Sequence, residues 1–504
     1  MDPHHDQAVV PGPTDPPPGH SPVCLLPGAR LDANARHQRP ILTSHEKALQ
    51  INLDPATYGS FAEIGAGQEV ARWFFRVGGA AGTIAKSISA YDMTVSDAIY
   101  GPSERYVSRQ RLQTMLAYEY ALQEERLAAQ RGQTTRFFSF ADTVAARSYS
   151  RADDWHGWMG IRFQIRPREP ASEIIVHVRM HDRENLQQQE ALGILGVNLI
   201  YAALFLHDQP ASLIGSLLDN LTADRAEVDM VKFSGPGFDG VDNRLMALEL
   251  VSQGLTETAM FTADGEVVQA AELLYKRPIL VERGSFRPVT RATVDMLECA
   301  RERFLREPPV AAAPDRVVSL MEMTLKNLAE GGVIDHRDFL ERVDTLGALG
   351  QTVLISHLGE FHRLAAYLFR NTKQRIALVL GASTLHEIFD EKYYADLEGG
   401  ILESFGRLFK NDLKLYVYPH RDPVTGALDT AANLALPPHL RHLHAYLLEN
   451  RFIEDLTGYD PSCLPIFAHD VLHQLRTGDA GWESLVPPRV ADRIKSRRLF
   501  GYRA

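Results

Sequence analysis

The sequence has 504 residues, which is more than one hydrophobic core usually serves, so we expect two or three folded units. Hydrophobic residues make up 45% and charged residues 23% of the chain, as in an ordinary globular protein. The formal net charge of -11 argues against broad electrostatic binding to nucleic acid or to an anionic membrane. We therefore expect neither a membrane partner nor a nucleic-acid partner.

The cysteines and the apolar runs bear on metal binding, membrane insertion and the cellular compartment. Cys24, Cys299 and Cys463 have neither the spacing of a disulfide framework nor that of metal ligands, so we expect no structural metal. The longest apolar stretch, residues 192–205, is too short to span a bilayer. These features favour a cytoplasmic protein.

The first 46 residues form a segment of their own. Nine of the 28 prolines lie in the first 40 residues, together with four histidines and no apolar period. We predict a disordered tail rich in proline and histidine over residues 1–46.

Residues 47–208 predict an α+β N-terminal domain. Residues 65–87 are typical of a helix, a glycine-rich break and a second helix start, and residues 105–131 predict a long helix. Alternating apolar residues at 161–165 and 174–180 predict an antiparallel hairpin with one solvent-facing side. An apolar helix is expected at residues 186–205.

Residues 209–504 change to short apolar runs followed by helical patterns. Such runs lie at residues 228–235, 258–265 and 278–284, and again near residues 352, 375 and 413. This alternation predicts a Rossmann-like α/β domain, with a largely parallel, doubly wound sheet and helices on both faces. A helix-rich stretch near 311–350 is expected to be an insertion.

Two glycine-bearing loops contain acidic side chains. In "SGPGFDGVDNR", Asp239 and Asp242 are candidate Mg²⁺ ligands, with a helix-capping aspartate as the alternative. In "FAEIGAGQE", Glu63 and Glu69 flank a glycine break and are candidate acid–base groups, with a capped helix start as the alternative.

The stretch "PILVERGSFRPVTRAT" contains the parts of a phosphate cradle. Gly284 permits close backbone approach, Ser285 offers a hydroxyl, and Thr290 can cap a helix or meet a phosphate. The same residues would also serve as a plain strand-to-helix corner. Residue types alone leave these two interpretations open.

The stretch "GSFRPVTRATVDMLECA" resembles the signature of nicotinamide and nicotinate mononucleotide adenylyltransferases. The resemblance implies an ATP site at this corner, and Thr293 stands where the family has a histidine. In "GASTLHE", Glu387 stands where a second family signature has arginine. The chain also contains "FAEIGAGQEV", "MVKFSGPGFDGVDNRLM" and "ILESFGRLFKNDLKLYVYP". With these stretches, residues 47–504 resemble a family of long bacterial cytosolic proteins with a nucleotidyltransferase-like label. The nucleotide-binding positions that the resemblance implies are Gly284, Ser285, Phe286, Pro288, Thr293, Ser383 and Thr384.

The resemblance implies adenylyl transfer from ATP to nicotinamide or nicotinate mononucleotide, a step of NAD biosynthesis. Thr290 and Arg287 are then the candidate catalytic residues, and Mg²⁺ is expected with ATP. Two alternatives stay open: a non-catalytic module that binds a nucleotide or sugar phosphate, and a protein-interaction scaffold. A homo-oligomer is compatible with each of them.

Overall fold

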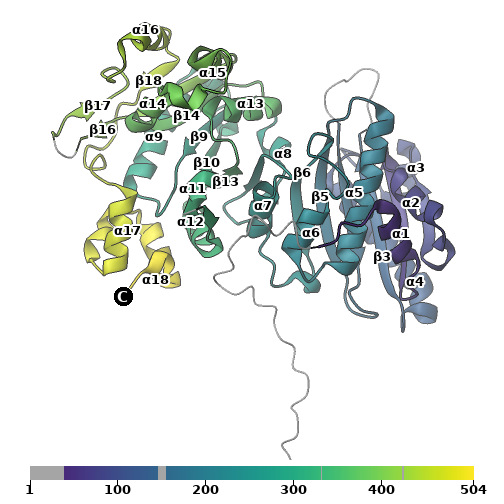
Figure 1. Cartoon of the computed structure of the whole chain (residues 1–504). Helices are drawn as coiled ribbons and strands as arrows, with labels where there is room; N and C mark the ends of the chain where they lie inside the picture. Colours follow the sequence, from purple (N-terminus) through teal and green to yellow (C-terminus); the bar gives the residue numbers. More distant parts are fainter. Residues whose placement is uncertain (1–38, 146–154, 331, 423–424, 504) are drawn as a thin grey trace, which may run out of the picture.

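The computed structural model describes residues 39–145, 155–330, 332–422 and 425–503. Most of the predicted tail lies outside these residues, but its last part does not, because helix α1 (Ser44–Asn52) already begins at Ser44 behind a capping box at Thr43. Figure 1 shows two α/β units side by side, each built around one large sheet. No helix in the described part of the chain has the length and apolarity needed to cross a membrane.

The first sheet has six strands in the order β2-β1-β3-β4-β5-β6. The strand β1 runs parallel to both β2 and β3, and the remaining pairs are antiparallel. The strands are β1 (Thr57–Gly65), β2 (Ile84–Ser89), β3 (Arg136–Val144), β4 (His156–Phe163), β5 (Ser172–Met180) and β6 (Ala226–Ser234).

Helices cover both faces of this sheet. The long helix α4 packs on β1, β3 and β4, whereas α5 packs on β4 and β5. This explains why the predicted hairpin, β4 with β5, has no solvent-facing side: both strands are buried along most of their length. The helices of this unit are α2 (Glu69–Val77), α3 (Met93–Tyr100), α4 (Arg109–Arg131), α5 (Asn185–Phe205), α6 (Pro210–Ser216) and α7 (Asn243–Ser252).

The second sheet confirms the predicted α/β class. Its eight strands lie in the order β18-β15-β14-β9-β10-β13-β7-β8, and the six from β18 to β13 are parallel. They are β7 (Thr258–Phe261), β8 (Val267–Val268), β9 (Ile279–Arg283), β10 (Val318–Thr324), β13 (Thr352–Ser356), β14 (Ile376–Gly381), β15 (Leu413–Tyr418) and β18 (Ile453–Asp455).

Helices lie on both faces of this sheet because alternate strand residues are apolar on both sides. Ile279 and Val281 of β9 join one apolar cluster, and Leu280 joins the other. The longer helices are α9 (Arg291–Leu305), α12 (His336–Ala348), α13 (Phe361–Asn371), α15 (Gly400–Leu408), α16 (Arg441–Glu449), α17 (Ala468–Thr477) and α18 (Pro488–Arg497). The shorter ones are α8 (Ala270–Leu274), α10 (Pro308–Ala311), α11 (Leu325–Leu328) and α14 (Ala382–Ile388).

Four predicted elements differ from the structure. The run at 228–235 is β6, which pairs antiparallel with β5, so the first sheet extends past residue 208. The run at 258–265 is β7, antiparallel to β13. The expected helical insertion at 311–350 contains β10, an inner strand of the parallel sheet. The expected second helix start before residue 87 is the edge strand β2. In each case the partner strand, which lies far away in the sequence, decides the conformation.

Candidate functional site

The second sheet has one topological switch point. After β9 the chain continues to β10 and β13 on one side, and then returns to β14, β15 and β18 on the other. Ligands of open parallel sheets bind beyond the carboxyl ends of the strands at such a reversal. The last register pair, Val379 with Glu282, is followed two residues later by Gly381 and Gly284. The structure therefore brings together the two motifs that the sequence analysis singled out.

The corner after β9 is closed by its own contacts. The Gly284 N–H donates to the Glu322 carbonyl at 3.0 Å, so this donor is not available to a phosphate. Phe286 has a left-handed backbone, with φ of 50°, and its ring is 4% exposed. A Cβ at Gly284 would lie 2.9 Å from that ring, which explains why glycine is required there. The Arg287–Pro288 peptide is cis, and Ser285 remains exposed.

Thr290 and Thr293 form a capping box at the start of α9. The Thr290 hydroxyl accepts from the Thr293 N–H at 3.3 Å, and the Thr293 hydroxyl accepts from the Thr290 N–H at 3.4 Å. Thr290 is 2% exposed. Both hydroxyls thus satisfy amide groups that the helix would otherwise leave without a partner.

Arg287 points to α12 and is neutralised there. Its Nε lies 2.6 Å from Asp338 Oδ1, and Arg342 makes a second ion pair with the same carboxylate. Arg342 also donates to the Ser285 carbonyl at 3.1 Å. The predicted catalytic cation is therefore part of a salt-bridge network that fixes the corner to α12.

A second cation, Arg283, was not among the predicted site residues, and it connects the ends of neighbouring strands at this edge. The Arg283 guanidinium donates to both Glu322 oxygens, at 2.8 and 2.9 Å, and to the carbonyls of Leu358 and Gly359. Glu322 is 0% exposed and also accepts from Ser356 at 2.6 Å. The sequence signal was a charged residue at the end of each apolar run, in "VERG" and "MEMT".

Glu282 lies beneath the same corner with its side chain on the other face of the sheet. It is 1% exposed, and its Oε2 has no hydrogen-bond partner in the structure. Burial raises the pKa of this carboxyl well above its usual range. Burial therefore disfavours the ionised form of Glu282.

The other predicted residues divide between the two sheets. Ser383 is exposed and Thr384 half-buried at the start of α14, beside the switch point. Asp239 and Asp242 follow β6 of the first sheet, so they do not lie at this edge. Asp242 caps α7 by accepting from the Arg244 N–H at 2.9 Å. Burial opposes its ionisation, but the bonds and charge of Arg244 lower its pKa.

The carboxylates near the second switch point do not fit a protein-held Mg²⁺ site. Glu282 is buried in surroundings that disfavour its ionised form, and Glu322 is paired with Arg283. In the described part of the chain, no group of three or more His, Cys, Asp or Glu side chains is placed to hold a metal ion. Magnesium would therefore have to come with the phosphates of a nucleotide.

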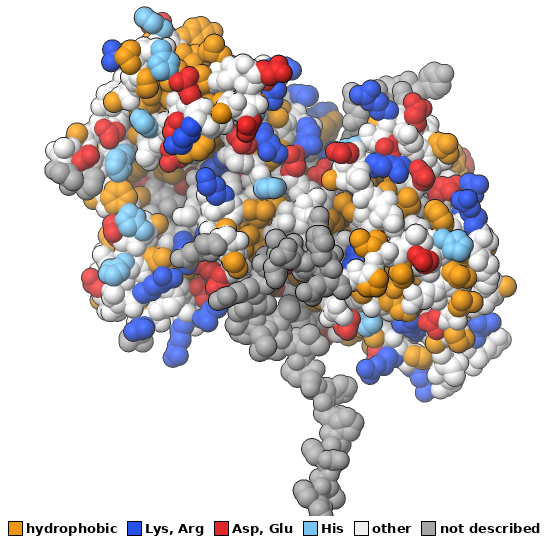
Figure 2. Space-filling model, in the orientation of Figure 1, with side chains coloured by type: hydrophobic (Ala, Val, Ile, Leu, Met, Phe, Trp, Pro, Cys, Tyr) orange, Lys and Arg blue, Asp and Glu red, His pale blue; other side chains and the backbone are white. Residues whose placement is uncertain are grey.

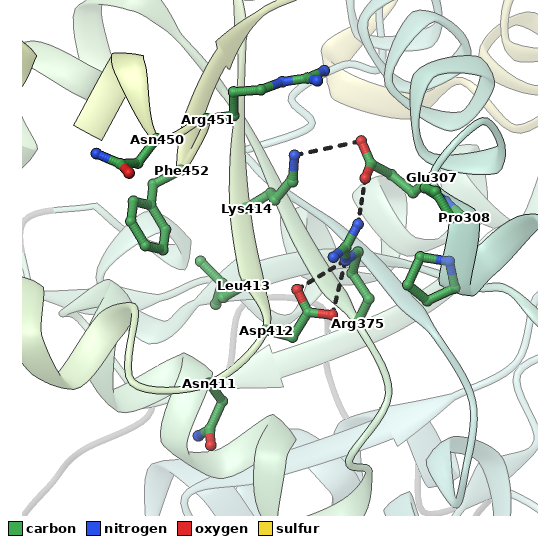
Figure 3. A pocket seen from close by; sticks show the side chains of 11 residues that line it. Glu307, Pro308, Arg375, Asn411, Asp412, Leu413, Lys414, Asn450, Arg451 and Phe452 are labelled. Atoms are coloured by element: carbon green, nitrogen blue, oxygen red, sulfur yellow. Dashed lines mark hydrogen bonds and ion pairs between the residues drawn. The ribbon is translucent and has the colours of Figure 1, made fainter. Parts of the chain in front are cut away.

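A cavity of about 600 Å³ lies at the opposite edge of this sheet, where β14, β15 and β18 begin (Figure 3). Its charged side chains are paired: Arg375 contacts Glu307 and Asp412, and Lys414 contacts Glu307 and Glu454. Each of these charged side chains therefore already has an ion partner within the protein. The cavity is also separated from the switch point by the length of the strands.

The first sheet has a switch point of its own. The strands lie in the order β2-β1-β3 and are parallel, so the chain reverses direction across the sheet at β1. Glu63 of β1 pairs in register with Asp142 of β3. Asp142 is 0% exposed with neither carboxylate oxygen hydrogen-bonded, whereas Glu63 accepts from the Ala71 N–H at 3.2 Å. Burial, with the neighbouring carboxylates, raises both pKa values, and that of Glu63 to about 7. The structure places both predicted acid–base groups at this edge. Glu63 lies beside Asp142, a partner that the sequence did not indicate, and Glu69 begins α2 and acts electrostatically on Glu63.

No family model matches the chain, and no match is found among curated proteins. Three solved structures illustrate the likenesses that exist. The competence/damage-inducible protein CihA of Agrobacterium tumefaciens is 15% identical, with 32% of this chain and 94% of that chain covered and a TM-score of 0.24. The nicotinic acid mononucleotide adenylyltransferase of Plasmodium falciparum, complexed with APC, is 12% identical, with 45% and 98% covered and a TM-score of 0.28. A CinA-superfamily protein of Enterobacter cloacae is 14% identical, with 33% and 95% covered and a TM-score of 0.24. Likenesses at this level assign no function to this chain.

Proposed function

We propose that the second unit binds a nucleotide at the carboxyl edge of its parallel sheet, between the ends of β9 and β14. The observation that carries the proposal is the reversal of strand order between these strands, at the place where the GSFRPVT corner lies. The exposed hydroxyls of Ser285 and Ser383 stand at the two sides of this edge. They are the groups that a phosphate would meet first.

The contacts of the corner favour binding without turnover. Adenylyl transfer from ATP requires donors and cations aimed at the phosphates, and loss of one such donor lowers the rate about 10²- to 10³-fold. Here Thr290 and Thr293 cap a helix, Arg287 pairs with Asp338, and Glu387 has the wrong charge for a phosphate contact. Transfer of an adenylyl group to nicotinamide or nicotinate mononucleotide is therefore the second candidate.

Calorimetric titration of the full-length protein with Mg²⁺-ATP, and with each mononucleotide alone, tests the proposal. Ser383→Asp places a negative charge at the edge without burying it and should weaken binding on the order of tenfold or more. Thr94→Asp is the matched control, because Thr94 is likewise an exposed second residue of a helix, α3 of the first unit.

The outcomes separate the candidates. Saturable binding that Ser383→Asp weakens and Thr94→Asp does not would support the proposal. Release of pyrophosphate with both substrates present would favour the transferase instead. Absence of binding by the wild-type protein, or equal effects of the two variants, would overturn the assignment of this edge.

A further inference from the structure

The cavity at the amino edge of the second sheet, where β14, β15 and β18 begin, has a volume of about 600 Å³, enough for a small organic molecule (Figure 3). Segments that are far apart in the sequence line it: residues 307–309, Arg375, residues 411–414 and residues 450–452. The three strands run parallel to one another, so this edge is the opposite end of the sheet from the switch point. The cavity is therefore not part of the proposed nucleotide site.

The ion pairs around the cavity form one network with an excess of positive charge. Its members are the carboxylates of Glu307, Asp412 and Glu454 and the cations of Arg303, Arg375, Lys414 and Arg451. In the described part of the chain, these side chains form ion pairs only with one another. Four cations therefore face three carboxylates, so the network carries one surplus positive charge when every group is ionised.

The inner part of the network holds its charges in fixed positions. Glu307 is 5% exposed and forms ion pairs with both Arg375 and Lys414. Burial opposes the ionisation of Glu454, but hydrogen bonds from Lys414 and two arginines lower its pKa to about 2. Because these contacts orient the cations in advance, a ligand would bind them with little rearrangement.

Arg375 retains hydrogen-bond donors that the protein does not use. Its Nε donates to Asp412, at 2.8 and 2.9 Å from the two carboxylate oxygens, and its Nη1 donates to Glu307. Among the described residues, none accepts a hydrogen bond from its Nη2. A guanidinium has five N–H donors in a planar fork that fits a carboxylate or a phosphate. Since Arg375 lines the cavity, the Nη2 donors are available to an oxyanion there.

Other parts of the wall are neutral. Phe452 is half-buried, and Pro308 and Leu413 add apolar surface, whereas exposed Asn411 contributes an amide (Figure 3). An aromatic ring offers a flat apolar surface to a ligand. A molecule with an oxyanion at Arg375 and a flat apolar part against this surface would match both kinds of wall.

We propose that this cavity is a second binding site, for a small organic oxyanion: a carboxylate or a phosphate monoester that carries a flat apolar group. The oxyanion accepts from Nη2 of Arg375, and its charge offsets the surplus of the network. The apolar group lies against Phe452 and Leu413. The proposal is independent of nucleotide binding, because no residue of the cavity lies at the carboxyl edge.

Ligand-observed NMR titrations of the full-length protein at fixed ionic strength test the site. Benzoate and phenyl phosphate carry the same ring with a carboxylate or a phosphate, and acetate and inorganic phosphate lack the ring. At least one ring compound should bind saturably, several-fold more tightly than its ringless counterpart, and the one that binds identifies the oxyanion. If neither ring compound binds saturably up to about 10 mM, the proposal is wrong.

Two neighbouring exposed residues give opposite predictions. Asn411→Asp adds a negative charge beside the cavity and should weaken binding on the order of fivefold. Asp412→Asn removes a carboxylate that competes for Arg375 and should strengthen binding by a similar factor. Asn185→Asp, at an exposed asparagine of α5 in the first unit, is the matched control and should change the affinity less than twofold. Ser383→Asp, at the carboxyl edge, should also leave it unchanged.

Circular dichroism checks that the variants keep the fold, as expected for exposed positions. Opposite shifts at residues 411 and 412, with both controls unchanged, would support the site. Equal effects of Asn411→Asp and Asn185→Asp, or no gain in affinity from Asp412→Asn, would overturn it. A loss of binding in Ser383→Asp would assign the oxyanion to the carboxyl edge instead.

Discussion

The two sheets have the same kind of switch point, but at the second one buried carboxyl, Glu322, has a cation beside it, as neither carboxyl of the first sheet's pair does. In the first sheet, Glu63 and Asp142 lie next to each other, and no cation contacts either of them among the described residues. In the second, Glu322 is fully buried but bonded to Arg283. Burial without a cation raises the pKa of both carboxyls of the first sheet, whereas Glu322 and Arg283 form an ion pair. The topology brings the carboxyls to the edge, and one neighbouring side chain decides their charge.

The surface gives little indication of this difference. On the face shown in Figure 2, acidic and basic side chains are interspersed over both units. The contrast is confined to buried groups, which solvent does not screen. Substitutions at the two edges should therefore have effects that surface substitutions lack.

The largest effect is expected from breaking the ion pair of the second sheet. Arg283→Met keeps most of the volume but leaves Glu322 buried without its cation, so we expect a loss of about 3–5 kcal/mol in the free energy of unfolding. Urea unfolding followed by circular dichroism measures it. Arg363→Met is the control: its partner Glu257 is 43% exposed, and less than about 1 kcal/mol should be lost. Equal losses in the two variants would show that burial does not make the Arg283–Glu322 pair more important for stability than an exposed ion pair.

The carboxyl pair of the first sheet predicts that the free energy of unfolding falls as the pH rises. The pKa of Glu63 is raised from 4.5 to about 7 in the folded protein, so its contribution to stability is full below pH 4.5 and is lost as the pH rises through 7. We expect wild type to lose on the order of 2–3 kcal/mol over this range from this group.

Glu63→Gln should remove this part of the pH dependence, whereas Glu125→Gln, on the exposed side of α4, should retain it. Unfolding free energies measured from pH 4.5 to 8 decide between the outcomes. A Glu63→Gln profile that still parallels wild type would show that the raised pKa of Glu63 does not contribute to the pH dependence of stability.

A smaller effect is expected at the corner of the second switch point. Thr290→Val removes the cap of α9 and should cost about 1 kcal/mol, and Thr290→Ser should restore it. Nucleotide affinity, measured by the same calorimetric titration, should change less than twofold in either variant. Loss of binding without loss of stability would instead make Thr290 a phosphate ligand.

The sequence determined the α/β class and most inner strands of the second sheet. Apolar runs such as "PILVERG" and "RIALVLGA" are typical of strands buried on both faces, and this local signal does not depend on the partner strand. It also placed Gly284 and Ser383 after strands. The prediction that a ligand site lies at the carboxyl ends of these strands stays a prediction.

Only the tertiary structure decided which strands pair and which charges meet. The sequence contains β6 and β10, but not the information that one joins the first sheet and the other lies inside the second, because pairing depends on contacts between distant segments. The same holds for Arg283 with Glu322, Arg287 with Asp338, and Glu63 with Asp142. Burial and neighbouring charge set the ionisation of these groups, and both arise only when the chain is folded.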